Sequence, residues 1–299
     1  MNRYLKKLIE SVKSPRAGVE LILRNIFAKV IPDEVYIQII ARLRFGKSFD
    51  LKNPKTFNEK LNWLKLHDRN PKYTLMADKH AVKDYVREII GEEYVVPCYG
   101  VYENGNLIDF NSLPPKFVLK CTHDSSGAII CKDRETFNQD AAINFINRCL
   151  KKNNFWHLRE WVYKDISPRV IVDQLLDDGS GHELRDYKFW CFNGIPRVMY
   201  ITNKAQNIYE NFYDMDFKAI DINHGFKRQK PEYEKPKQFE LMKQLASKLS
   251  KDIPFVRVDF FNIGQKVYFG EFTFYDWGGF RPFNNMQTDL MLGKMLKTG

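Results

Sequence analysis

The sequence predicts an α+β fold, with a helical N-terminal third and a largely antiparallel C-terminal half. Apolar side chains recur at helical spacing in most segments up to about residue 90. After that point, short apolar runs bounded by turn residues dominate, and several are joined by hairpin turns. The chain has 299 residues, 44% of them hydrophobic, which is enough for a large buried core. Helices followed by strands are typical of α+β proteins.

Three helices are expected before residue 50. Residues 3–13 are amphipathic and basic, Pro15 and Gly18 are expected to interrupt the pattern, and further helices are expected at about 19–30 and 33–43. The basic first helix has two interpretations. It is either a peripheral contact with an anionic inner-membrane surface or a helical cap packed on the body of the protein.

Helix-capping signals place the next two helices. Thr56 followed by Glu59 forms a capping box after the turn residues around position 54. Asp78 is the expected N-cap of the following helix, and Gly91 is expected to end it.

The remaining chain reads as strands with two helices between them. Thr136 and Gln139 predict a second capping box and a helix to about Lys152, and residues 236–253 are a clear amphipathic helix. Strands are expected in the segments YVVPCYGVY, LPPKFVLKC, RVIVDQLL, RDYKFWCFNG, PRVMYITN and FVRVDFFNIGQKVYFGEFTF.

Composition narrows the class of partner. The formal charge of +10 suits nucleic acid, an anionic membrane, or phosphorylated and acidic-sugar substrates, and it also fits a well-solvated surface. The excess is spread along the chain, so we expect no nucleic-acid partner. Five cysteines at irregular spacing indicate reduced thiols and a cytoplasmic protein. No apolar run is long enough for a transmembrane helix, and no secretory signal is recognisable.

Residues 256–273 place charged side chains in an otherwise apolar and aromatic hairpin. They are Arg257, Asp259 and Glu271, and burying any of them unpaired would cost several kcal/mol. With a three-residue loop, Asp259 and Glu271 share a face and are diagonal neighbours, close enough to bind one Mg²⁺. With a two-residue loop they lie on opposite faces. The alternative to a metal site is an Arg257–Glu271 salt bridge with Asp259 in solvent.

The hairpin RVDFF…VYFGEFT resembles the metal-binding hairpin of ATP-grasp ligases. Three further segments resemble that fold in the right order: FVLKCTHDSSGAIICKD, VIVDQLL and RDYKF. More narrowly, NPKTFNEKLNWLK, ADKHAVKDYV, LRDYKFWCFNG and YFGEFTF resemble the TupA-like ATP-grasp family, over about residues 51–283. The resemblance implies an ATP-grasp fold, in which two α+β subdomains grip ATP.

The resemblance also implies a division of the chain. Residues 1–50 would form a helical N-terminal region, and 51–115 a domain that precedes the ATP-grasp unit. Residues 116–175 would be ATP-grasp subdomain A, and 176–299 subdomain B with the metal-binding hairpin.

The site residues implied by the resemblance fall into three groups. Arg257 and Lys188 would be catalytic, acting on the phosphates. The metal ligands would be Asp259, Glu271 and Thr273, although the family usually has Asn at the third position. The ATP-binding residues would be Lys120, Ser125, Ser126, Gly127, Lys132, Asp173, Gln174, Leu176, Asp178 and Lys188; for the ribose-binding acid, the sequence does not choose between Asp177 and Asp178.

The implied function is an ATP- and Mg²⁺-dependent carboxylate–amine ligase that forms an amide through an acyl phosphate. The family is associated with bacterial surface polysaccharide and teichuronopeptide synthesis. A uronic acid of a capsule or other surface-glycan precursor would be the acid, and an amino acid or amino alcohol the amine.

A different class of enzyme remains open. Asp214 and Asp216 form the D-x-D pattern by which many nucleotide-sugar transferases bind a metal, so a metal-dependent glycosyltransferase is the alternative. The same residues also read as a polar turn between strands.

Overall fold

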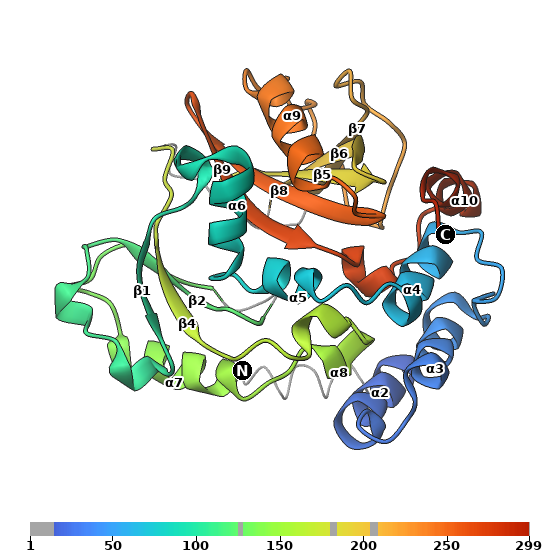
Figure 1. Cartoon of the computed structure of the whole chain (residues 1–299), viewed down its shortest axis with the longest axis horizontal. Helices are drawn as coiled ribbons and strands as arrows, with labels where there is room; N and C mark the ends of the chain where they lie inside the picture. The colour runs from blue at the N-terminus through green and yellow to red at the C-terminus, as the bar shows by residue number, and fades with distance from the viewer. Residues whose placement is uncertain (1–14, 125–127, 180–183, 204–208, 299) are drawn as a thin grey trace.

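Two antiparallel sheets with helices packed around them form the body of the protein, as the α+β prediction requires (Figure 1). The computed structural model describes residues 15–124, 128–179, 184–203 and 209–298. The smaller sheet, sheet A, has the strand order β1-β4-β2-β3, and the larger, sheet B, has the order β7-β6-β5-β8-β9.

The strands of sheet A are β1 (Cys98–Tyr102), β2 (Phe117–Cys121), β3 (Ile129–Cys131) and β4 (Val170–Gln174). Those of sheet B are β5 (Asp186–Phe192), β6 (Ile195–Asn203), β7 (Tyr209–Tyr213), β8 (Phe255–Ile263) and β9 (Lys266–Thr273). Because β1 pairs with β4, the segment 51–115 contributes a strand to the sheet that holds the segment 116–175.

The α-helices of the described chain are α2 (Pro15–Ile22), α3 (Asp33–Phe45), α4 (Phe57–His67), α5 (Lys72–Ala77), α6 (Val82–Ile90), α7 (Gln139–Leu150), α8 (Phe155–Leu158), α9 (Phe239–Leu249) and α10 (Met286–Met295). A π-helical segment, Leu23–Phe27, follows α2. Short 3-10 turns occur at Glu92–Tyr94, Gly105–Leu107, Phe110–Ser112, Trp161–Tyr163 and Asp276–Gly279.

The N-terminal helices pack on the rest of the chain as a cap. Tyr36 and Ile40 of α3 join a buried cluster with Leu158 and Phe280, which come from distant parts of the sequence. The expected first helix, 3–13, lies outside the described residues. The second helix was expected from about residue 19, but the described helix α2 already includes Pro15 and continues through the glycine at 18, so that glycine does not interrupt it. A proline in the first turn loses no helical hydrogen bond.

The capping predictions have mixed outcomes. The Thr56–Glu59 capping box is present, and Gly91 ends α6. The expected box at Thr136 is wrong: the side chain of Asn138 accepts the hydrogen bond from Ala141 N, and Thr136 donates instead to Asp133.

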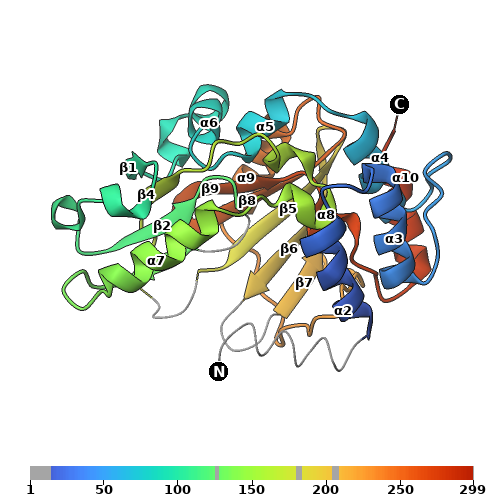
Figure 2. The same ribbon diagram turned by 90° about the horizontal axis from the view of Figure 1, so that it is seen from below.

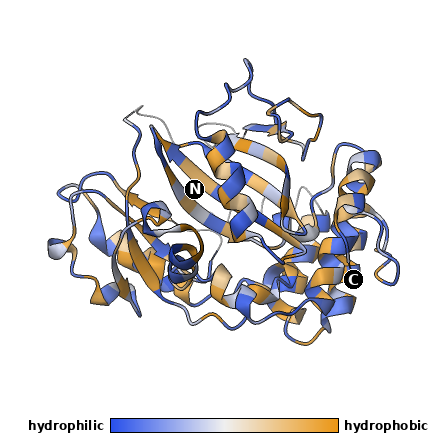
Figure 3. Cartoon of the chain, turned by 45° about the horizontal axis from the view of Figure 1, so that its top comes forward, coloured by the Kyte–Doolittle hydropathy of each residue, from blue (hydrophilic) through white to orange (hydrophobic). Residues whose placement is uncertain are grey.

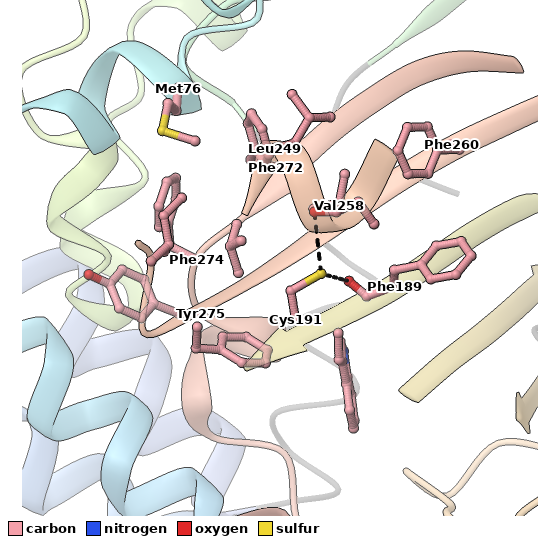
Figure 4. Packing of buried hydrophobic residues seen from close by; sticks show 14 of the residues in the cluster. Met76, Phe189, Cys191, Leu249, Val258, Phe260, Phe272, Phe274 and Tyr275 are labelled. Carbon is pink, nitrogen blue, oxygen red and sulfur yellow. Dashed lines mark hydrogen bonds between the residues drawn. The ribbon is translucent and has the colours of Figure 1, made fainter. Parts of the chain in front are cut away.

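The main core lies between sheet B and the helices that cover it. Helix α9 covers one face of sheet B (Figure 3), and its buried residues are Phe239, Met242, Leu245, Ala246 and Leu249. Figure 4 shows Cys191 of β5 among aromatic rings of this core, where its thiol lies near the carbonyl oxygens of Phe189 and Ala246. Burial raises the pKa of this thiol to about 12, so it stays protonated at neutral pH.

The β8–β9 hairpin has a register that neither regular alternative predicts. Ile263 pairs with Lys266 across a two-residue turn, yet Arg257 pairs with Thr273 because the register shifts between Val258 and Phe260. At this β-bulge Asp259 faces two residues of β9, Gly270 and Glu271. The bulge reverses the alternation of β9 and brings Glu271 to the same face as Asp259.

Glycine at position 270 avoids crowding at the bulge. A Cβ atom on Gly270 would lie 3.1 Å from the backbone oxygen of Asp259 and 3.3 Å from the ring of Phe261. A side chain would therefore push β8 and β9 apart at the position where the two carboxylates come together.

Candidate functional site

A charged cleft lies between the two sheets, against α6. It is lined by Lys79, Lys83, Lys120, Lys188, Asp124, Asp173, Asp186, Asp259 and Glu271, together with an apolar wall that includes Val82, Val86, Val95 and Val96. Figure 2 shows sheet A and the β8–β9 hairpin approaching each other on this side of the molecule. An apolar wall beside a group of cations suits a ligand with a flat apolar part and an anionic part.

The sheet A side of the cleft is centred on the buried carboxylate of Asp173. Its oxygens lie 3.1 Å from Nζ of Lys120 and 3.0 Å from Nζ of Lys83. Lys120 comes from β2, which pairs directly with β4, whereas Lys83 reaches in from α6. Two cations thus share one carboxylate, which leaves positive charge available for an anionic ligand.

The sheet B side begins at Lys188, which is opposite Asp259 in the β5–β8 pairing. Its amine makes an ion pair with Asp259 and lies 3.4 Å from an oxygen of Asp186. Burial alone would lower the pKa of Lys188, but the two carboxylates reverse this effect and raise it. Lys188 is therefore a permanent cation, as phosphate binding requires.

Arg257 holds three carboxylates together. Its Nε and Nη2 lie 2.7 Å from the two oxygens of Asp259, Nη2 lies 3.2 Å from Glu271, and Nη1 lies 2.6 Å from Asp276. Nη1 also donates to the hydroxyl of Tyr200 at 3.2 Å. The expected Arg257–Glu271 contact exists, but Asp259 is buried and paired rather than solvated.

Glu271 is the carboxylate most open to the cleft, with 35% of its side chain exposed. Lys79 lies 3.1 Å from its Oε2. Burial tends to raise the pKa of Glu271, but Lys79, Arg257 and Lys188 hold it well below its usual value. Glu271 is therefore ionised throughout the physiological pH range.

The carboxylates of Asp259 and Glu271 fit a Mg²⁺ site. They are hard oxygen donors on one face of the hairpin, and Mg²⁺ commonly uses one or two carboxylates and takes its other ligands from phosphate and water. Thr273 lies on the same face, opposite Arg257. Within the described residues, no group of three or more His, Cys, Asp or Glu side chains is arranged to hold a metal.

Other expected ligand-binding residues lie apart from the cleft lining or cannot be placed. Ser125, Ser126 and Gly127 lie outside the described residues. Lys132 lines a separate hollow between β3 and α7. The backbone N–H of Gln174 donates to Pro97 O at 2.9 Å, and Leu176 and Asp178 follow β4 beyond the residues that line the cleft.

The D-x-D residues form a turn after the edge strand β7. An oxygen of Asp214 accepts hydrogen bonds from the backbone N–H groups of Asp216 at 3.0 Å and Lys218 at 2.8 Å. Asp216 is mostly exposed and lies near Lys218. This geometry is that of an Asx turn, which uses the Asp214 oxygen for the backbone.

Lys79 and Lys83 are cleft residues that the sequence did not predict, although both lie in the segment ADKHAVKDYV, which resembles the family. With the N-cap expected at Asp78, their spacing of four residues would have put both on one side of the predicted helix, which was a usable signal. In the structure α6 begins at Val82, so Lys79 lies in the turn before it. The direction of the two side chains was not predictable, because it depends on a contact between distant segments. The backbone N–H of Lys79 donates to Thr122 O at 3.0 Å and joins the turn before α6 to the residue after β2.

In the described chain, no helix combines the length and apolar character needed to cross a membrane. No curated protein matches the sequence. Among solved structures, the chain is similar to D-alanine–D-alanine ligase from Helicobacter pylori, with 14% identity, 81% of this chain and 67% of that chain covered, and a TM-score of 0.44.

Two further solved structures are similar at the same level. The D-alanine–D-alanine ligase from Bacillus anthracis complexed with ATP has 14% identity, with 74% of this chain and 63% of that chain covered and a TM-score of 0.42. The D-cycloserine synthetase DcsG has 16% identity, with 74% and 69% covered and a TM-score of 0.40.

The family model described as TupA-like ATPgrasp matches residues 59–297, which include the whole cleft. The match covers most of the chain and agrees with the two-sheet architecture. The chain belongs to the TupA-like ATP-grasp family, and with it to the ATP-grasp ligases.

Proposed function

We propose that this protein is an ATP- and Mg²⁺-dependent carboxylate–amine ligase. The substrate carboxylate attacks the γ-phosphorus of ATP, which gives an acyl phosphate and ADP. The nitrogen of an amine then attacks the acyl carbon, phosphate leaves, and the amine gives up a proton, so that an amide is formed.

The observation that carries the proposal is the cleft between the sheets. Lys79 and Lys188 contact the carboxylates of the hairpin, beside Arg257, and two further lysines line the cleft from the sheet A side. Such a group of charges suits a triphosphate held by a divalent cation, because phosphoryl transfer is catalysed mainly by positioning and charge neutralisation.

On the sheet A side, we assign phosphate binding to Lys120 and Lys83. Both amines now share Asp173, and a triphosphate would offer them a larger negative charge without removing that partner. We assign the adenine to the apolar wall at Val82, Val86 and Val95, which is continuous with these lysines. Asp178 remains our choice for the ribose.

On the sheet B side, Asp259 and Glu271 would hold Mg²⁺, with Thr273 beside them. When bound, the metal would neutralise charge on the phosphates. Lys79 now pairs with Glu271 and would be released toward the phosphates. Arg257 is fixed by three carboxylates in a position to stabilise the transferring phosphoryl group, and Lys188 acts beside it.

We propose a uronic acid of a bacterial capsule or surface-polysaccharide precursor as the acid, and an amino acid or amino alcohol as the amine. The family resemblance and the basic charge of the chain support this choice. The proposal does not include a nucleic-acid partner.

The test is ADP release by purified protein with Mg²⁺, ATP, a panel of uronic acids and nucleotide-linked uronic acids, and a panel of amines. We expect ADP release that needs both an acid and an amine. Glu271→Gln should lower the rate by about 100-fold or more, because it removes a charge that acts at the reacting phosphate.

Asp216→Asn is the matched control, since it also neutralises one carboxylate but at an exposed turn. It should leave the rate unchanged. Binding of uridine nucleotides without adenine nucleotides, or full activity in Glu271→Gln together with loss in Asp216→Asn, would overturn the ligase proposal.

A further inference from the structure

An exposed apolar stripe runs along the outer side of α2, the π-helical segment after it and the turn that follows. It consists of Val19, Ile22, Ile26, Phe27 and Val30, which are between 43% and 74% exposed. The described chain has fifteen large exposed hydrophobic side chains, and six of them, these five and Val35, lie within seventeen residues. Single exposed apolar residues are ordinary, whereas a concentration on one element indicates a contact surface.

The stripe has helical spacing, and the opposite side of the same helix is already used. Glu20 makes an ion pair with Arg44 of α3 at 2.8 Å, and Ala28 is buried in the cluster that joins the N-terminal cap to the body. The inner side therefore fixes the orientation of α2, and Val19, Ile22 and Ile26 must point away from the protein.

The charge around the stripe is basic. Among residues 15–30, Arg16, Arg24 and Lys29 outnumber the single acidic residue, Glu20. In the sequence alone, the first 30 residues have seven Lys and Arg against two Glu, which is half of the formal net charge of +10. The expectation that the basic excess is spread along the chain is therefore wrong, because half of it lies in the first 30 residues. One of the two acidic residues, Glu20, is neutralised by Arg44, whereas Arg16 and Lys29 beside the stripe are exposed.

We propose that the stripe of Val19, Ile22, Ile26, Phe27 and Val30 docks on an anionic lipid bilayer. Apolar side chains on one side of a surface helix, with cations beside them, match the two components of an anionic membrane surface, which are acyl chains and negative headgroups. A protein partner would instead need a complementary apolar groove with acidic edges, and the experiment below distinguishes that case. Figures 1 and 2 show α2 at the outer edge of the molecule, where a flat surface can reach it.

The proposal extends the membrane expectation beyond the segment 3–13 to a surface whose side chains the structure describes. It does not depend on the ligase assignment. Membrane attachment would favour an acid substrate that is presented at the bilayer over one that diffuses freely.

The experiment is co-sedimentation of the full chain with vesicles of phosphatidylcholine alone and of phosphatidylcholine with phosphatidylglycerol. We expect binding to the anionic vesicles that weakens at high salt. The double variant Ile26→Glu/Val30→Glu should lower the binding constant by more than about tenfold, because it places charges in the apolar contact. Ile26→Ser/Val30→Ser should also weaken binding, without adding charge.

Leu107→Glu/Ile195→Glu is the matched control: both side chains are similarly exposed, at 56% and 47%, and lie outside the stripe. It should bind like the wild type. The far-UV circular dichroism spectrum and the thermal unfolding midpoint, measured on every variant without ligand, should match those of the wild type and confirm that each one is folded.

Three results would overturn the proposal. They are no binding of the wild type to anionic vesicles, equal loss of binding in the control and stripe variants, and a wild-type dimer in sedimentation velocity that the stripe variants convert to a monomer. The last result would assign the stripe to a second copy of the chain.

Discussion

Arg257 explains how an otherwise apolar hairpin tolerates so many charges. Its guanidinium contacts Asp259, Glu271 and Asp276, while Lys188 and Lys79 supply further positive charge to the first two. Removing one partner of such a network leaves a buried charge without compensation, which costs more than the pair itself contributes. The charges on β8 and β9 are therefore mutually dependent.

Glu271 gives a prediction for the pH dependence of stability. Its folded-state pKa lies below the reference value of 4.5, so ionised Glu271 stabilises the folded state above about pH 4.5. As the pH falls below that value, the unfolded chain takes up the proton first and this stabilisation is lost. The free energy of unfolding should therefore differ between wild type and Glu271→Gln at pH 6, and the difference should shrink at pH 3.

Urea unfolding at both pH values measures this difference. For Asp216→Asn, at an exposed turn, the difference in free energy of unfolding from the wild type should be the same at pH 6 and pH 3. A difference between wild type and Glu271→Gln that stays constant from pH 6 to pH 3 would mean that the cations around Glu271 do not stabilise its ionised form.

At the scale of the element, the start of α7 tests how a local signal can mislead. Thr136 and Gln139 have capping-box spacing, yet Asn138 accepts the hydrogen bond from Ala141 N at 2.9 Å. Thr136 and Asn138 are both residue types that cap helices well. Which of them caps α7 depends on the position of the backbone after the preceding turn at Asp133. The sequence could predict the helix but not its first residue.

Asn138→Ala should lower the free energy of unfolding by about 1 kcal/mol, because it removes the side chain that accepts from Ala141 N. Thr136→Ala should change it by less than about 0.5 kcal/mol, as expected for a surface residue away from a cap. Chemical denaturation of the two variants measures both values. If Thr136→Ala were the more destabilising of the two, the helix would begin at the box that the sequence suggested.

The β8–β9 hairpin shows a different limit of sequence reasoning. Both registers considered from the sequence were regular, and each fixed the relative faces of Asp259 and Glu271 by the length of the turn alone. Because of the bulge at Gly270, the length of the turn no longer determines the relative faces of the two carboxylates. The hairpin has a two-residue turn, yet Asp259 and Glu271 lie on one face. A glycine before Glu271 was the available signal, since glycine within a strand often marks a bulge.

At the scale of the whole molecule, the cleft exists because two separate sheets approach each other. Sheet A contributes Lys120 and Asp173, and sheet B contributes Lys188, Asp259 and Glu271, so neither sheet holds the site alone. A ligand that contacts both sheets should therefore raise the free energy of unfolding of the whole chain and not of one sheet alone.

A non-hydrolysable ATP analogue with Mg²⁺, at 100 times its dissociation constant, should add about 2.7 kcal/mol to the free energy of unfolding. For a chain of this size, that corresponds to a rise in Tm of roughly 4 °C. Thermal denaturation measures the shift, which should decrease in Lys120→Ala at the same ligand concentration. Lys132→Ala is the control, because Lys132 lies outside the cleft; equal shifts in the two variants would remove Lys120 from the nucleotide site.

The sequence by itself determined the α+β class, most of the strands, the Thr56 cap and the charged residues of the hairpin. These features follow from side-chain periodicity, capping chemistry and the cost of burying charge, all of which act within a few residues. Tertiary structure decided the bulged register and the direction of Lys79 and Lys83. Both depend on a contact with a segment whose position is fixed only when the sheets and helices pack, so a local pattern could signal them but not specify them.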